Sequence, residues 1–528
     1  MVHWKSEKIT VGLFFIIYLL MGIAIHADYG ISWDELTQRL HGPINHKYIG
    51  EKIAPFLLTG ETAEALDLYK WYDRDYGVAS EIVFYGLERA FNIDGDMNIY
   101  IFRHLLTFLC AFAGVLALYA AAKNTYGDYR IGLIAALMMI LSPRMFAESF
   151  YNSKDIIFMS SCAIVIYAIV KYSLDGRLVS AFLCGLFTAV SIDLRIMGIM
   201  FIPIFCVASI GLFLRKQVSI KRLCLNSLIY IVISSAFIYF LFPFLWEHPI
   251  DNFIYSFNNM KNFRFTGPTH YLGMFHKCME LPWHYIPVWV LITTPLAYSA
   301  LMIIGTFVIF GQLAKNIFGF FKDQKLLLDL IFLSLVLCPV AAVIILSSVL
   351  YDGWRQMYFI YPAFILVAIK GFVFLLNSTK MVRYSAMAVV AFSFMWNAAW
   401  IFNAHPLQNV YFNVLAGKDW RNNFEVDYWG LANREAIQYI LDNDPGSTIT
   451  LKAVSGANLH VSVLIFPQKD RERIVLAGPN EDARYLLTNY RNWEDCDKGD
   501  AEYLKSHDLF YEKTIDGEII LRIFKRRD

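Results

Sequence analysis

Apolar residues in this chain gather in long blocks that are separated by shorter polar segments. A helix needs roughly 20 mostly apolar residues to cross the hydrocarbon core of a membrane. About eleven blocks approach that length, so the pattern predicts a polytopic α-helical membrane protein with about 11 transmembrane helices. The predicted spans are Ile9–Ile25, Ile99–Ala121, Ile131–Phe146, Ile156–Tyr172, Val179–Ile192, Met197–Leu214, Leu223–Trp246, Ile286–Phe310, Leu326–Leu350, Met357–Ala368 and Ala386–Phe402.

Lysine and arginine are concentrated in alternate connections between these spans, beginning with the N-terminal Lys5 and Lys8. Cytoplasmic loops of membrane proteins carry an excess of these residues, so this set of connections predicts the cytoplasmic side. Because the number of predicted spans is odd, the C-terminus is expected on the opposite, periplasmic or extracellular side.

The first loop on that opposite side covers residues 26–98. Its regular spacing of apolar and aromatic residues argues against a flexible connector. Helical spacing with many aromatic residues, over Glu61–Lys70 and Val78–Phe91, predicts amphipathic helices that lie in the membrane interface. We assign this loop to a transmembrane domain over residues 1–402.

The hydrophilic tail predicts a second domain, over residues 403–528. Glu435–Leu441 has the spacing of an amphipathic helix, and Thr448–Val454 and Arg473–Ala477 read as strands. Ile515–Glu518 contains Asp-Gly between two alternating segments, which is typical of a hairpin turn. These elements predict a small, soluble α/β domain outside the cytoplasm.

Composition agrees with the membrane prediction, because 57% of the residues are hydrophobic and 17% are charged, whereas soluble domains carry about 25% charged residues. No nucleic-acid partner is expected. The eight cysteines contain no C-x-x-C spacing, so we expect no metal or redox site. Cys278 and Cys496 lie in predicted outer segments and are either a disulfide or two free thiols.

The adjacent acids Asp34 and Glu35 follow the first span directly. A carboxylate is costly to hold beside a bilayer, which makes this pair the first candidate for chemistry. A low-dielectric cleft raises the pKa of a carboxylate and makes it a better general base, and a second carboxylate can orient an acceptor. The alternative is structural, since Ser32 or Asp34 could cap a following helix.

Asp155 is the third candidate acid and ends the short second outer loop, which also contains Lys154. A charge-dense turn between two spans favours the lining of a cleft. The alternative is an acid that simply stabilises a helix N-terminus.

Basic residues on the outer side are few, and Arg103, Arg195, Arg355 and Lys154 are the candidates for binding a lipid phosphate. Arginine holds phosphate oxygens bidentately and lysine acts as a point charge. Gly353 allows close backbone approach near Arg355. The alternatives are pairing with nearby carboxylates and contact with ordinary headgroups.

Two motifs resemble those of a known family. WDELTQRLHG (33–42) resembles the first-loop acidic motif, and NSKDIIFM (152–159) the second-loop Asp motif, of GT-C superfamily membrane glycosyltransferases. Within that superfamily the chain resembles the protein mannosyltransferase and aminoarabinose lipid A transferase (glycosyltransferase family 39/83-like) group. His405–Gly430 resembles a stretch of its bacterial members.

The resemblance implies an enzyme of the bacterial cytoplasmic membrane that transfers a hexosyl or pentosyl group from a polyprenyl-phosphate-linked donor. It implies inversion at the anomeric carbon by single displacement and a glycan, lipid or protein acceptor. Asp34 matches the catalytic first-loop acid, Glu35 its neighbour, Asp155 the second-loop acid and Arg103 a frequent second-span arginine. The resemblance implies no required cofactor, and it leaves open whether a divalent metal takes part. A transporter or flippase of a lipid-linked envelope precursor is the alternative, although such proteins usually contain repeats and broken helices at the midplane.

Overall fold

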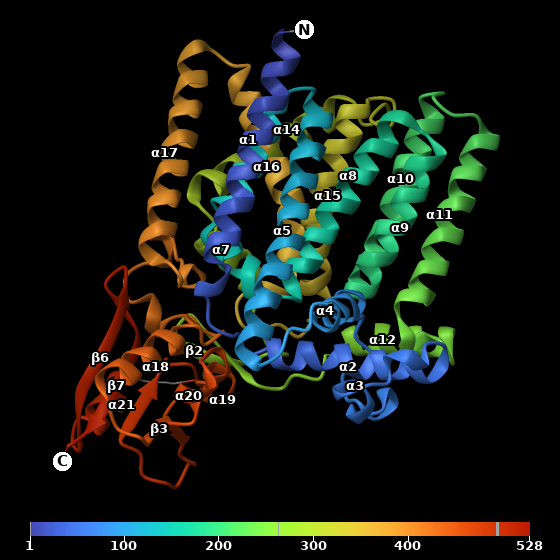
Figure 1. Cartoon of the computed structure of the whole chain (residues 1–528). Helices are drawn as coiled ribbons and strands as arrows, with labels where there is room; N and C mark the ends of the chain where they lie inside the picture. The colour runs from blue at the N-terminus through green and yellow to red at the C-terminus, as the bar shows by residue number, and fades with distance from the viewer. Residues whose placement is uncertain (1, 262, 493–495, 528) are drawn as a thin grey trace.

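The computed structural model describes residues 2–261, 263–492 and 496–527. Within these residues, nine helices are long and apolar enough to cross a membrane. They run roughly side by side as one bundle (Figure 1). These helices are α1 (Val2–Ile25), α5 (Asp96–Tyr126), α8 (Asp155–Asp175), α10 (Phe201–Leu214) with the short helix that precedes it, α11 (Ile220–Leu241), α14 (Leu296–Lys315), α15 (Gln324–Ile345), α16 (Tyr361–Leu376) with the short helix that precedes it, and α17 (Lys380–Ala404).

The polytopic helical fold is confirmed, but two of the expected spans differ from simple crossings. The third is a pair of helices, α6 (Tyr129–Ile140) and α7 (Pro143–Tyr151), bent by 72° at their junction. Pro143 lacks a backbone N–H and starts a new helix there. The fifth, α9 (Leu178–Leu194), is apolar but short. The described residues therefore contain nine spans, or ten if the bent pair is one span.

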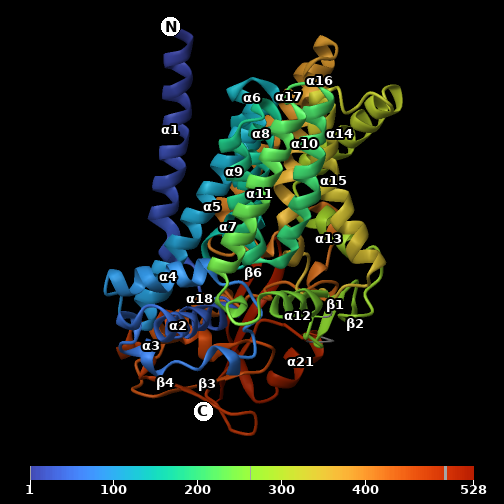
Figure 2. The same ribbon diagram turned by 90° about the vertical axis from the view of Figure 1, so that its right-hand side faces the viewer.

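Four helices lie across one end of the bundle, opposite the N-terminus (Figures 1 and 2). The helix expected over Val78–Phe91 is confirmed as α4. The one expected over Glu61–Lys70 is divided into α3 and the short helix η3 (Leu68–Lys70), because the backbone is extended at Ala65, whose carbonyl accepts from Lys47 Nζ at 2.8 Å. These helices are α2 (Glu35–Lys52), α3 (Glu61–Glu64), α4 (Ala79–Ala90) and α12 (Pro249–Lys261).

A five-stranded sheet lies at the same end (Figure 1), in the order β4-β3-β5-β7-β6. Strand β3 is parallel to β4 and β5, whereas β7 is antiparallel to β5 and β6. The expected hairpin joins β6 to β7 through Asp516 and Gly517, both with positive φ. The strands are β3 (Ile449–Ala453), β4 (Ile474–Leu476), β5 (Tyr485–Thr488), β6 (His507–Ile515) and β7 (Glu518–Arg526).

Shorter elements complete the fold. A separate hairpin of β1 and β2 follows α12, and α18 packs against β7. These elements are β1 (Pro268–Tyr271), β2 (Met274–Lys277), α13 (Tyr285–Thr293), α18 (Ala432–Asn443), α19 (Leu459–Ser462), α20 (Gln468–Arg471) and α21 (Cys496–Tyr503).

The segment that leads from α17 to α18 packs into the end of the bundle. The buried Arg144 of α7 donates from Nε to the Tyr411 carbonyl at 3.0 Å, and its guanidinium lies 4.7 Å from the Phe412 ring centre. Asn413 N donates to the Ile292 carbonyl of α13 at 2.8 Å. These contacts hold the start of the tail against the spans.

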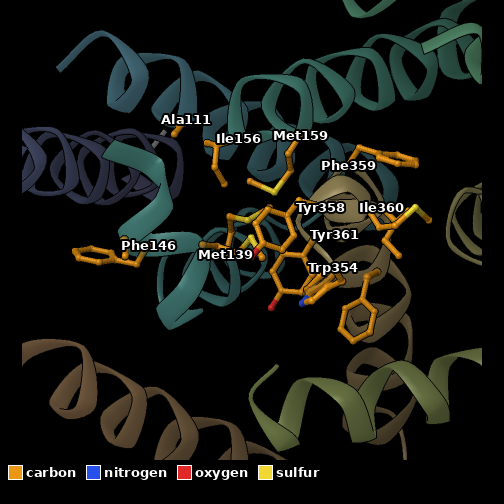
Figure 3. Close-up of a cluster of buried hydrophobic side chains, with 14 of the residues drawn as sticks. Ala111, Met139, Phe146, Ile156, Met159, Trp354, Tyr358, Phe359, Ile360 and Tyr361 are labelled. Carbon is orange, nitrogen blue, oxygen red and sulfur yellow. The ribbon is translucent and has the colours of Figure 1, made fainter. Parts of the chain in front are cut away.

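An aromatic core supports the start of α16. Trp354, Tyr358 and Tyr361 lie next to one another (Figure 3), and the Trp354 and Tyr358 ring centres are 4.8 Å apart. Trp354 Nε1 donates to Thr293 Oγ1 at 2.8 Å, and the Tyr361 hydroxyl lies 2.6 Å from Ser142 Oγ. This packing fixes the short helix η6 (Arg355–Ile360), whose first residue enters the site described next.

Candidate functional site

Asp34 lies directly before α2 and its side chain points to another part of the chain. Its Oδ2 accepts a hydrogen bond from Arg355 Nη1 at 2.8 Å. About 31% of the Asp34 side chain is exposed, whereas Arg355 is buried. The acid is therefore anchored by an ion pair while it stays reachable from outside.

Asp155 begins α8 and is almost completely buried. Its Oδ2 accepts from Arg355 Nη1 at 3.2 Å, and its Oδ1 pairs with Arg195 Nη2. Asn152 fixes the turn, because its Oδ1 accepts from Asp155 N at 2.8 Å. Asp155 thus joins two of the predicted phosphate-binding arginines to Asp34.

Arg355 is the centre of this arrangement. Besides Asp34 and Asp155, it donates from Nη2 to Asp352 Oδ2 at 3.1 Å. Its guanidinium lies 4.6 Å from the Trp429 ring centre and 4.9 Å from that of Tyr351. Stacking on aromatic faces keeps a buried guanidinium planar and in place.

Lys154 lies beside the same cluster, with Nζ 3.8 Å from the Tyr76 ring centre. Burial and the neighbouring Arg195 lower the pKa of Lys154 to about 8. Its ammonium group is consequently charged at neutral pH and neutral in mildly alkaline solution.

The expectation of a raised pKa at Asp34 is wrong. Burial does raise the pKa of this carboxyl, but the charges of Arg355 and Lys154 outweigh burial and hold the pKa below its usual range. The carboxylate is therefore ionised throughout the neutral range.

Two predicted residues have their contacts elsewhere. Glu35 Oε1 accepts from Ser32 N at 2.6 Å, and its Oε2 lies 2.9 Å from His104 Nε2. Arg103 forms a buried double ion pair, with Nη1 2.6 Å from Glu81 and Nε 2.5 Å from Glu88. Of the seven predicted residues, five therefore meet at one site: Asp34, Asp155, Arg355, Arg195 and Lys154.

Three contributors were missed by sequence reasoning. Asp352 lies in the same tight turn as Arg355 and could have been suspected from that spacing. Trp429 and Arg491 come from the tail, and no local pattern connects them with the first loop. Arg491 donates from Nη2 to Asp352 Oδ1 at 3.0 Å.

A cavity of about 270 Å³ opens beside the cluster. Its lining combines polar groups with apolar side chains. The charged and amide residues are Asp75, Lys154, Arg195, Asn259 and Gln356, and the one acid among them, Asp75, is paired with Arg264 Nη2 at 2.6 Å. The apolar side chains include Met197 of η4 (Ile196–Met200), Met260 of α12, Val343 of α15 and Leu346 directly after α15. Such a lining suits an amphiphile with an anionic head.

Within the described residues, no group of three or more histidine, cysteine or acidic side chains is arranged to hold a metal ion. Cys278 is buried, and its Sγ lies 3.1 Å from the Phe265 carbonyl. The Cys496 side chain lies outside the described residues, so the suggested disulfide stays a prediction.

Residues 87–246 match the sequence model of a family described as dolichyl-phosphate-mannose-protein mannosyltransferase. This match contains Asp155, Lys154 and Arg195 and confirms the expected resemblance to this group of membrane glycosyltransferases for that part of the chain. No curated protein matches the sequence.

Two solved structures are similar over nearly the whole chain. ArnT from Cupriavidus metallidurans bound to undecaprenyl phosphate is 10% identical, with 97% of this chain and 98% of that chain covered and a TM-score of 0.49. The same protein in the apo state is 10% identical, with 98% of each chain covered and a TM-score of 0.45.

Proposed function

We propose that this protein is a glycosyltransferase that moves a sugar from a polyprenyl-phosphate-linked donor to a hydroxyl of an acceptor. The observation that carries the proposal is the convergence of Asp34, Asp155 and Arg355, with Arg195 and Lys154, beside the amphiphilic cavity. The family match over residues 87–246 supports the same reaction class.

The cation set supports a phosphate-linked donor. The Nε–H groups of Arg195 and Arg355 are buried and find no hydrogen-bond partner among the described residues. A buried donor without a partner is costly, so an anionic ligand that accepts from these groups would relieve that cost. The apolar lining along Val343 and Leu346 would receive the start of the lipid chain. Undecaprenyl phosphate is the lipid bound to the similar ArnT.

Asp34 is the proposed general base. It would take the proton of the acceptor hydroxyl as that oxygen forms a bond to the anomeric carbon. The bond between the anomeric carbon and the phosphate oxygen breaks in the same step, and the polyprenyl phosphate leaves with the bonding pair. The configuration at the anomeric carbon inverts, because the displacement is single.

Arg355 and Lys154 would stabilise the charge that develops on the leaving phosphate. Their positive charge is already in place before the reaction, so no reorganisation is needed as the phosphate leaves. Asp155 acts in this scheme as an orienting group, since both its oxygens are engaged by Arg195 and Arg355.

The reaction is assigned to the outer face of the cytoplasmic membrane. Helix α2, which begins directly after Asp34, lies at the end of the bundle opposite the N-terminus (Figure 1). The lysine-rich loops predict a cytoplasmic N-terminus. An acceptor on a glycan, a lipid or a protein would approach from the side of the sheet domain and the first loop.

The decisive experiment uses purified full-length protein and a synthetic undecaprenyl-phosphate sugar, with released undecaprenyl phosphate measured by chromatography. Asp34→Asn should lower turnover by about 10²- to 10⁴-fold, while undecaprenyl phosphate binding persists. The matched control is Asp28→Asn, since Asp28 lies in the same loop and is 49% exposed. Normal turnover by Asp34→Asn would show that Asp34 is not the general base.

A further inference from the structure

Arg491 reaches from the sheet domain into the catalytic cluster. Its Nη2 donates to Asp352 Oδ1 at 3.0 Å, and its Nη1 donates to the Tyr428 carbonyl at 2.6 Å. Its guanidinium also lies 4.9 Å from the ring centre of Trp33, the residue before Asp34. One side chain from the tail therefore contacts both the first loop and the Asp352 turn.

Asp352 lies between two guanidinium groups. Its Oδ1 accepts from Arg491 and its Oδ2 from Arg355 at 3.1 Å. The Asp352 side chain is only 6% exposed, so water offers little competition for these bonds. Arg355 in turn holds Asp34 and Asp155. A continuous chain of charge-assisted bonds thus runs from Arg491 to the proposed base.

The backbone around Arg491 is held in an unusual conformation. Tyr490 and Asn492, on either side of it, have φ angles of 61° and 64°, in the left-handed region that residues other than glycine rarely adopt. Gly456 N donates to the Arg491 carbonyl at 2.9 Å, and Arg491 N donates to Asn489 Oδ1 at 3.3 Å. Such strain persists where the surroundings fix it, and it is concentrated at functional sites.

Asp352 shows the same feature from the other side, with a φ angle of 53°. The two side chains that meet therefore both come from strained turns, one before η6 and one after β5. The two turns are far apart in the sequence and share no helix or strand. Tertiary packing, not local folding, therefore brings the pair together.

We propose that Arg491 is a positioning residue, which holds Asp352 and thereby fixes the Arg355 guanidinium for the donor phosphate. This inference rests on the proposed function for the identity of the ligand. It makes the sheet domain a part of the active site. Without Arg491, Asp352 keeps Arg355 as its cationic partner but loses its anchor, and Arg355 gains freedom to leave the position between Asp34 and Asp155. A small misplacement of a phosphate-binding group is enough to weaken binding and catalysis.

The first test measures undecaprenyl phosphate affinity and the KM and kcat for the donor, on full-length purified protein. Arg491→Ala should weaken affinity and raise KM by roughly tenfold, and Asp352→Asn should do the same. The double variant should lose no more than about twofold beyond the larger single effect, because both residues act through Arg355. Arg491→Lys keeps the charge but cannot hold both Asp352 and the Tyr428 carbonyl, so it should fall between the wild type and Arg491→Ala.

The matched control is Arg484→Ala, since Arg484 lies in the same domain, is 40% exposed and pairs with Asp444. It should bind and turn over as the wild type does. A purely structural role for Arg491 would lower the amount of active protein and leave KM and affinity unchanged in what remains. That result, or single effects that multiply in the double variant, would overturn the proposal.

The second test needs no donor and separates this inference from the proposed function. Hydrogen exchange of the amides in the 351–355 turn should become roughly tenfold faster in Arg491→Ala and stay unchanged in Arg484→Ala. A wild type that does not bind undecaprenyl phosphate would refute the proposed function alone. Unchanged exchange in Arg491→Ala would refute the positioning role, whatever the ligand.

Discussion

Arg355 Nη1 bridges two carboxylates, 2.8 Å from Asp34 and 3.2 Å from Asp155. The two acids come from different loops of the chain, and one guanidinium nitrogen contacts both. A lysine offers a single point charge and cannot keep three acceptors, Asp352 included, in fixed directions.

Arg355→Lys should therefore lower kcat/KM for the donor by about 100-fold, which corresponds to about 2.7 kcal/mol of lost stabilisation. Steady-state kinetics with varied donor measures the effect. Arg383→Lys, at an exposed position in the first turn of α17, is the matched control. Equal kcat/KM in the wild type and Arg355→Lys would contradict the central role of this guanidinium.

The lowered pKa of Lys154 predicts that activity declines in alkaline solution. Its pKa is lowered to about 8 by burial and Arg195, so the side chain is charged below that pH and neutral above it. kcat/KM for the donor, which reports the free enzyme, should fall as the pH rises through about 8. Lys154→Arg should abolish this transition, because arginine stays charged. A transition that persists in Lys154→Arg belongs to another group.

The buried ion pairs of Arg103 predict that its removal lowers the stability of the protein and leaves donor binding unchanged. It is buried with Glu81 and Glu88, and removal of one member of a buried ion pair costs about 3–5 kcal/mol. Arg103→Ala should lower the thermal unfolding midpoint in detergent, while the folded fraction keeps the wild-type KM. Arg89→Ala, at an exposed position of α4, should leave the midpoint unchanged. A raised KM in Arg103→Ala would restore Arg103 to the phosphate-binding set.

The position of the cavity beside α15 predicts that a bulky side chain in its lining hinders donor binding. Ala342 lines the cavity and its neighbour Ala341 does not. Ala342→Trp should weaken undecaprenyl phosphate binding by tenfold or more, about 1.4 kcal/mol, whereas Ala341→Trp should have little effect. Both variants are compared by a competition binding assay in the same detergent. Equal affinities would place the lipid elsewhere.

Much of the fold could be predicted because membrane spans and amphipathic helices leave periodic patterns. Ala79–Ala90 and the turn at Asp516 and Gly517 are examples. The number of long spans was overestimated, because apolar content alone does not reveal the break at Pro143 or the shortness of α9.

The site could be predicted only in part. Asp34 and Asp155 were recognisable from motifs, and Arg355 from its chemistry. The contacts of Glu35 and Arg103 depend on how the first loop packs against α5. Glu35 meets His104 of α5, and Arg103 of α5 meets Glu81 of α4. Such pairings are set by tertiary packing, which leaves no periodic trace in one sequence.

Strand β5, which leads to Arg491, lies between β3 and β7 and pairs with both. The position of Arg491 is therefore only as exact as the strand pairing on either side of it. If Arg491 holds the Asp352 turn as proposed, a substitution that loosens β3 or β7 would be felt first as weaker donor binding, although the membrane spans and the acids of the first and second loops stay intact.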